Sequence, residues 1–62
     1  MNKHERLTIG RCEVVHGEYG FYVVDENGQY LNKSGVPKWA ATWFATQEEA
    51  VAVAKAPALK WQ

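Results

Sequence analysis

The chain has 62 residues and 7.0 kDa, is 47% hydrophobic, and carries seven acidic and seven basic side chains. This length predicts one domain, residues 1–62, because a second core could not be buried in so short a chain. A single cysteine excludes an internal disulfide and is typical of a reducing compartment. No apolar run reaches the ~20 residues of a membrane span. We therefore expect a small cytoplasmic domain that does not associate with membranes.

Alternating polarity predicts β-strands in the first two thirds of the chain, with no internal repeat. The alternation slips at Gly10-Arg11, which we interpret as a bulge within one strand. Asn27-Gly28 is the dipeptide favoured in two-residue type I′ hairpin loops, and such a loop pairs Val24 with Leu31. The predicted strands cover residues 5–15, 19–26, 29–33 and 39–45.

A helix is predicted over residues 47–56, followed by a C-terminal tail, residues 57–62. It begins with a capping box, in which the Thr46 hydroxyl accepts the Glu49 N–H and the Glu49 carboxylate reaches back. The order of elements predicts an α+β fold. An antiparallel sheet of three to four strands carries one C-terminal helix on one face.

One short helix leaves the other sheet face open to water or to a partner. Phe44 lies two residues before the helix cap, where its side chain is expected to turn beneath the helix. Alternation then places Trp39 and Trp43 on the open face. Contiguous exposed aromatic side chains mark interaction sites. The predicted binding residues are the anchors Trp39 and Trp43, the flanking Tyr30 or Tyr22, and Lys38 at the rim.

Four alternatives stay open at this point. The tail could cover the open face through Trp61, or a strand phase wrong by one residue would exchange the two faces. In the hairpin, both the face with Tyr22 and Leu31 and the face with Phe21 and Tyr30 are apolar enough for the core. A homodimer through the open face would satisfy the same pattern as a different protein partner.

The sequence predicts neither catalysis nor a metal or cofactor site. Cys12 and His16 would lie about 13 Å apart on an extended strand, too far to share an ion. Asp25 and Glu26 fall at a hairpin tip, where solvated turn residues are usual. Phosphate-binding loops, nucleophile elbows and zinc-protease motifs do not occur. We therefore expect a protein that is not an enzyme.

The layout of residues 19–25 (YGFYVVD), followed by a turn, a last strand and a helix, resembles the arm-binding domains of phage-type integrases. This resemblance implies contact between the sheet and DNA. Those domains are markedly basic, whereas residues 12–30 here hold four acidic residues and no Lys or Arg. Because phosphate neutralisation supplies most non-specific affinity, nucleic-acid binding is the alternative function.

Residues 21–56 are similar to small hairpin-plus-helix domains of phages and bacteria. The shared element is Phe44-x-Thr46-x-Glu48-Glu49-Ala50. The resemblance implies binding and modulation of a host protein, and it transfers no site residue. Together with the open aromatic face, it predicts a non-catalytic protein-interaction module.

Overall fold

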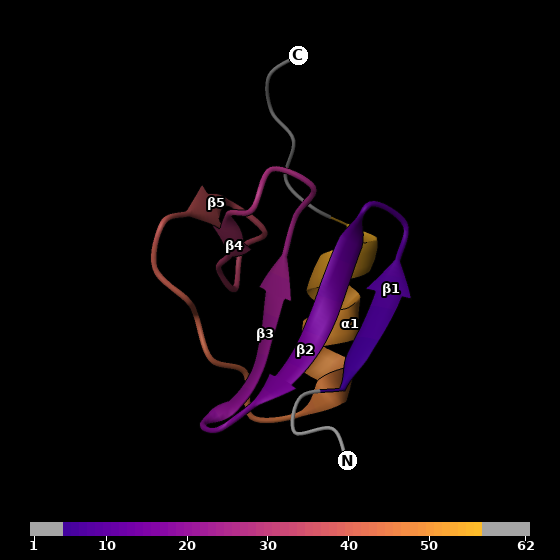
Figure 1. Cartoon of the computed structure of the whole chain (residues 1–62), viewed down its shortest axis with the longest axis vertical. Coiled ribbons are helices and arrows are strands. Elements are labelled where there is room, and N and C mark those ends of the chain that lie inside the picture. The colour runs from indigo at the N-terminus through magenta and orange to yellow at the C-terminus, as the bar shows by residue number, and fades with distance from the viewer. Residues whose placement is uncertain (1–4, 57–62) are drawn as a thin grey trace.

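The computed structural model describes residues 5–56, which form one antiparallel sheet and one helix (Figure 1). Within these residues the sheet has five strands in the order β1-β2-β3-β4-β5, so each strand lies beside its neighbour in sequence. The α+β prediction is confirmed, with one strand more than expected. The elements are β1 (Arg6–Ile9), β2 (Cys12–Gly17), β3 (Gly20–Val24), β4 (Tyr30–Leu31), β5 (Pro37–Lys38) and α1 (Gln47–Lys55).

The predicted bulge at Gly10 is instead a hairpin turn. Ile9 pairs with Cys12, so Gly10 and Arg11 form a two-residue loop between β1 and β2. Gly10 has φ 60°, and no non-glycine residue in residues 5–56 has a positive φ. A positive φ at the first loop residue alone is the pattern of a type II′ turn, for which glycine is favoured at that position.

The loop around Gly28 contains three residues, 26–28, because the Asp25 N–H donates to the Gln29 carbonyl at 2.9 Å. The predicted two-residue type I′ turn is therefore wrong. Val24 pairs with Tyr30, one residue earlier than expected. The Asp25 carboxylate explains the change, because its Oδ1 accepts the N–H groups of Asn27 and Gln29, both at 2.9 Å. The loop closes with a left-handed Gly28, φ 84°, as in three-residue hairpins with a glycine bulge.

The same loop recurs between β4 and β5. Asn32 Oδ1 accepts the N–H groups of Ser34 and Val36, at 2.8 and 2.9 Å. Gly35 has φ 81° and donates its N–H to the Asn32 carbonyl, as Gly28 does to that of Asp25. The chain therefore does contain a short repeat, Asp/Asn-x-x-Gly, which makes two hairpin loops in succession.

Residues 39–45 do not form the predicted strand. The last strand, β5, lies earlier, and Phe44 makes an isolated bridge with Phe21. Its N–H donates to the Phe21 carbonyl at 2.7 Å, and the Phe21 N–H donates to the Phe44 carbonyl at 2.9 Å. The far end of the same edge of β3 is already paired with β4. Gly20 permits this approach, because a Cβ there would lie 2.5 Å from the Phe44 carbonyl oxygen.

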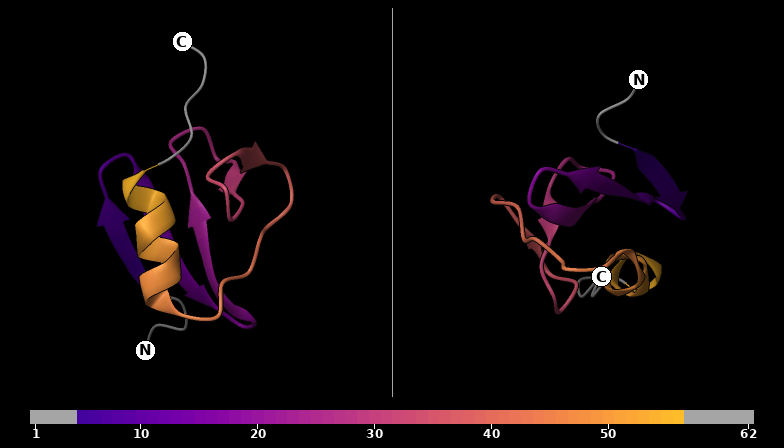
Figure 2. Two further views of the ribbon diagram at one scale, coloured as in Figure 1. Left: turned by 180° about the vertical axis from the view of Figure 1, so that it is seen from behind. Right: turned by 90° about the horizontal axis from the view of Figure 1, so that it is seen from below.

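Helix α1 covers one face of the sheet, as the view from behind shows (Figure 2). The Thr46 hydroxyl accepts the Glu49 N–H at 3.2 Å, so the predicted cap is present. No helix in residues 5–56 is long and apolar enough to cross a membrane. The predicted tail, residues 57–62, lies outside the described residues.

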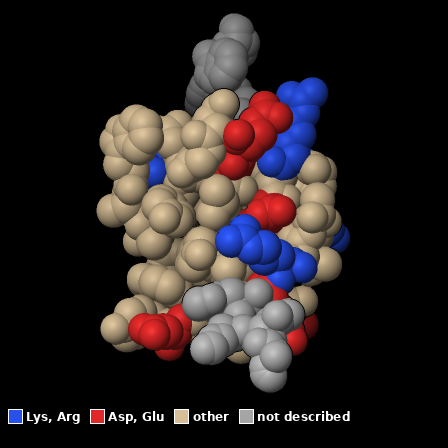
Figure 3. Space-filling model, in the orientation of Figure 1, with Lys and Arg blue, Asp and Glu red and all other residues tan. Residues whose placement is uncertain are grey.

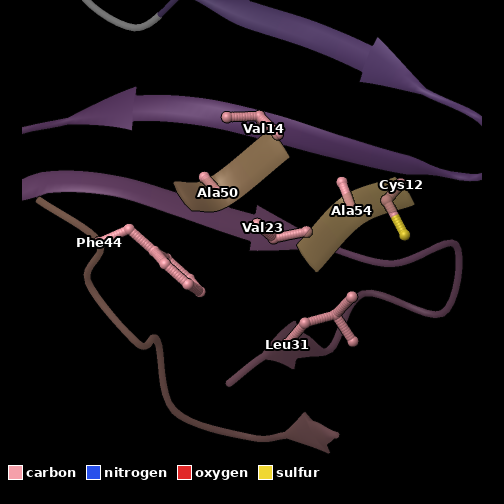
Figure 4. Close-up of a cluster of buried hydrophobic side chains, with 7 residues drawn as sticks. All are labelled: Cys12, Val14, Val23, Leu31, Phe44, Ala50 and Ala54. Carbon is pink, nitrogen blue, oxygen red and sulfur yellow. The ribbon is translucent and has the colours of Figure 1, made fainter. Parts of the chain in front are cut away.

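The core lies between α1 and the sheet (Figure 4). Phe44 is buried beneath the helix, as the sequence predicts, and Leu31 lies on the same side of the sheet. Small helix residues allow close packing against the valines of β2 and β3. The cluster consists of Cys12, Val14, Val23, Leu31, Phe44, Ala50 and Ala54.

Candidate functional site

The register of the β3–β4 hairpin decides which side chains leave the core. Val23 and Leu31 are almost fully buried, at 0% and 1% exposure, on the helix side. Because Val24 pairs with Tyr30, alternation places Tyr22 and Tyr30 together on the face away from α1. The sequence grouped Tyr22 with Leu31 on one face and Phe21 with Tyr30 on the other. Because Tyr22 and Tyr30 share a face, neither grouping is correct.

Four aromatic rings form a continuous row on that second face, which we call the aromatic strip: Tyr19, Trp43, Tyr22 and Tyr30. Tyr19 and Trp43 meet edge to face at 5.3 Å between ring centroids, and Trp43 meets Tyr22 at 5.2 Å. Tyr22 then meets Tyr30 at 5.4 Å. These are the favoured distances and orientations for aromatic pairs. The strip joins the β2–β3 turn to β4 across the sheet.

Tyr19 belongs to the strip but was not among the predicted binding residues. It lies in the turn between β2 and β3 and is 74% exposed, whereas the other three rings are half-buried. The sequence predicts Tyr19 at the start of a strand over residues 19–26, whereas in the turn the direction of its side chain depends on the hairpin. The bridge at Phe44 brings the ring of Trp43 to this face, and Tyr19 joins the row because it contacts that ring.

The second face is partly covered by the chain itself. Val15 is fully buried although it points away from α1, since its neighbour Val14 lies in the core. In the sheet, Val15 stands between Arg6 and Tyr22. Trp43 lies on Gly17, where a Cβ would be 3.0 Å from its ring carbons Cη2 and Cζ3. The strip therefore stabilises the sheet as well as presenting aromatic surface.

Lys38, at the end of β5, and Trp39, which follows it, are both exposed. Trp39 is 82% exposed and directly follows β5. The sequence grouped it with Trp43 because of an alternating strand that is not formed. Within residues 5–56 no ring pair joins Trp39 to the strip. Of the five predicted residues, the structure thus brings Trp43, Tyr22 and Tyr30 into one row.

Charges on this side of the molecule are concentrated away from a broad uncharged area (Figure 3). Oppositely charged side chains pair with one another over β1 and β2 and between the β1–β2 and β3–β4 loops. Arg6 contacts Glu13 at 2.7 Å, and Arg11 lies 3.7 Å from Glu26. The uncharged area lies on the side of β3, β4 and the following segment. Among the described residues, this surface carries no basic field of the size that nucleic-acid binders present.

The helix side offers little for chemistry. Burial raises the pKa of the Cys12 thiol, and the nearby carboxylates of Asp25 and Glu26 raise it further. A protonated thiol is a poor nucleophile. His16 stacks on Phe21 with ring centroids 4.3 Å apart. Residues 5–56 hold no cluster of three or more His, Cys, Asp or Glu side chains placed to bind a metal ion.

Comparison of the chain with models of protein families, with curated protein sequences and with solved structures finds no match. The resemblances to phage and bacterial domains therefore stay predictions from the sequence.

Proposed function

We propose that this protein is a non-catalytic interaction module that binds another protein through the aromatic strip and the neighbouring Trp39. The observation that carries this proposal is the continuous row of edge-to-face rings on the part of the sheet face where few charged side chains lie. Tyrosine and tryptophan dominate the binding energy of protein interfaces, since they bury a large area while losing few rotamers.

Different parts of the strip have different roles in this proposal. Trp43 and Tyr22 are half-buried and pack edge to face, so they form the rigid base of the binding surface. Tyr19 and Trp39 are mostly exposed and supply the surface that a partner would cover. Lys38 is exposed next to Trp39 and serves as a polar rim residue. The half-buried Tyr30 extends this base of the binding surface to β4.

The resemblance of residues 21–56 to phage and bacterial domains makes a bacterial host protein the first kind of partner to test. A cytoplasmic location is part of the same proposal, because the buried Cys12 is a free thiol.

The decisive experiment compares binding by variants that change exposed surface without touching the core. The immobilised chain is exposed to a bacterial lysate, and the retained proteins are identified by mass spectrometry. We expect a specific protein to bind the wild type and to be lost from the Tyr19→Ala/Trp39→Ala double variant. Arg11→Ala is the control, since Arg11 is also a large side chain, 81% exposed, but lies in the loop between β1 and β2.

A partner that binds all three proteins equally would contradict the assignment of the strip. A titration of tryptophan fluorescence with single- and double-stranded oligonucleotides tests the alternative function. Saturable quenching that weakens steeply with salt would favour nucleic-acid binding over our proposal.

A further inference from the structure

Within residues 5–56, β1 is an end strand of the sheet, and no described strand pairs with its outer edge. The Glu5 carbonyl accepts the His16 N–H at 3.0 Å and so points toward β2. Backbone direction alternates along a strand, so Leu7 and Ile9 also bond toward β2, and Arg6 and Thr8 present their N–H and C=O groups outward.

Such an edge can pair with another strand, but charged side chains, Pro, bulges and very short strands hinder such pairing. The one charge on β1, Arg6, is bound to Glu13 of its own chain, and the four residues of β1 exceed the two of β5. The Arg-Leu-Thr-Ile segment of β1 has no Pro, Lys or bulge.

The opposite edge of the sheet is protected. Strand β5 has only two residues and begins with Pro37, which cannot donate a backbone hydrogen bond. The two edges therefore differ in their capacity to accept a further strand, and β1 is the competent one.

A groove runs beside this edge on the helix side. It has a volume of about 480 Å³ between β1 and α1. Leu7 forms its wall on β1 and is 41% exposed, and Val51 and Ala52 lie at the middle of its wall on α1. The full lining is Leu7, Gln47, Glu48, Val51, Ala52 and Lys55.

The charges in the groove indicate what would fill it. Glu48 lies in the first turn of α1 and Lys55 in the last, so opposite charges stand at opposite ends with apolar residues between them. A two-fold axis beside Leu7 reverses the direction of a second copy. Glu48 of one copy would then face Lys55 of the other, twice in the same interface. The groove is self-complementary in charge.

We propose that two copies of this chain associate by antiparallel pairing of their β1 strands about a two-fold axis at Leu7. Arg6 of one copy pairs with Thr8 of the other through the outward backbone groups, and the two Leu7 side chains meet in the joined grooves. Arg6 stays bound to Glu13 of its own chain on the other face. Within residues 5–9, no like charges become opposed in this register.

The pairing would be reversible. A standard stable interface buries about 800 Å² on each partner, more than one four-residue strand and one side of a short helix supply. We therefore expect dimerisation to depend on concentration, with free monomer at low concentration. The aromatic strip lies on the face away from α1, so this dimer would leave it available to the partner proposed above.

Sedimentation of the whole chain over a wide concentration range tests the proposal. The wild type is expected to shift from 7.0 kDa toward twice that mass as concentration rises. Thr8→Pro removes an outward N–H that β2 does not use, so the sheet should remain. It should raise the dimer dissociation constant about tenfold or more, because each copy loses a hydrogen bond. Thr8→Ala keeps the N–H and is the matched control.

A charge exchange tests the two-fold arrangement itself. Lys55→Glu places like charges opposite each other and should weaken the dimer, whereas Glu48→Lys/Lys55→Glu restores opposite charges and should recover it. Circular dichroism verifies that each variant is folded. A wild type that stays monomeric up to millimolar concentration would overturn the proposal. An extended peptide of another protein would then be the next candidate to pair with the edge of β1. A dimer unaffected by Thr8→Pro would also overturn it and place the contact elsewhere, with the aromatic strip tested next.

Discussion

Trp43 lies directly on the backbone of Gly17, in space that any side chain at residue 17 would occupy. A Cβ there would lie 3.0 Å from two carbons of the indole and 3.3 Å from Cε2 of Tyr22. The packing of the aromatic strip thus requires that residue 17 have no side chain. An aromatic ring over a glycine in a sheet restores the packing that the missing side chain leaves out.

The first prediction concerns this contact. Gly17→Val should displace the indole from the strip, since a branched side chain cannot share the space with the ring. We expect an unfolding free energy lower by about 1–3 kcal/mol, as for other overpacked sites. Near-ultraviolet circular dichroism should lose signal as the ring pairs separate. Urea unfolding measures the stability.

A double-mutant cycle is the control for this interpretation. In a Trp43→Ala background the added valine should cost much less, because the ring it displaces is absent. An equal cost in both backgrounds would show that the valine acts on the backbone of the hairpin and not on Trp43.

The twin hairpin loops give the second prediction. Asp25→Asn should change stability by less than about 0.5 kcal/mol, because Asn32 makes the same pair of hydrogen bonds in the following loop. Asp25→Ala should cost about 1–2 kcal/mol, since two backbone N–H groups lose their acceptor. Chemical denaturation of both variants checks this. A large loss in Asp25→Asn would show that the negative charge, and not the shape of the side chain, maintains the loop.

The third prediction concerns the start of α1. Thr46→Ala removes the acceptor of the Glu49 N–H and should lower the unfolding free energy by about 1 kcal/mol. Gln47→Ala, at the adjacent exposed position, is the control and should have little effect. Thermal unfolding of both variants is sufficient. An unchanged melting temperature in Thr46→Ala would contradict the helix boundary.

The fourth prediction concerns pH. Burial, followed by the charges of Asp25 and Glu26, raises the pKa of Cys12 above its ordinary value of 9.0. The folded state therefore retains the thiol proton at pH values where the unfolded chain has lost it. This contribution to stability is complete below the unfolded-state pKa and is lost as pH rises through the folded-state pKa.

Two measurements check this prediction. Stability at alkaline pH should fall less steeply in Cys12→Ala than in the wild type, because the variant has no thiol to titrate. The wild-type thiol should react slowly with a disulfide reagent at pH 8 while the protein is folded, and rapidly in denaturant. Equal rates in both conditions would show that the thiol is accessible in the folded chain.

The parts of the fold that were predictable from sequence are those determined by neighbouring residues. Thr46 and Glu49 define the helix start through one local hydrogen bond, and Phe44 follows from that position. The β3–β4 register was missed because the Asp25 side chain selects a longer loop than Asn27-Gly28 alone indicates. The pattern Asp/Asn-x-x-Gly, present twice, is the signal that could have revealed it.

The composition of the site depends on contacts between distant segments. Trp43 joins Tyr22 because Phe44 pairs with Phe21, and alternation within residues 39–45 contains no information about that bridge. Trp39 was grouped with Trp43 on the assumption of a continuous strand. Tyr19 was missed because the direction of a turn side chain depends on the strands on both sides.

The bridge between Phe21 and Phe44 also bears on the order in which the chain folds. The contact between Val24 and Tyr30 closes a short loop, whereas the contact between Phe21 and Phe44 closes a much longer one. Short loops cost less entropy to close, so the hairpins are expected to form first. The aromatic strip would then be completed last, when Trp43 arrives with Phe44. A chain whose hairpins are formed but whose helix has detached would lack this surface, and recognition through it would therefore distinguish the fully folded protein from its partly folded forms.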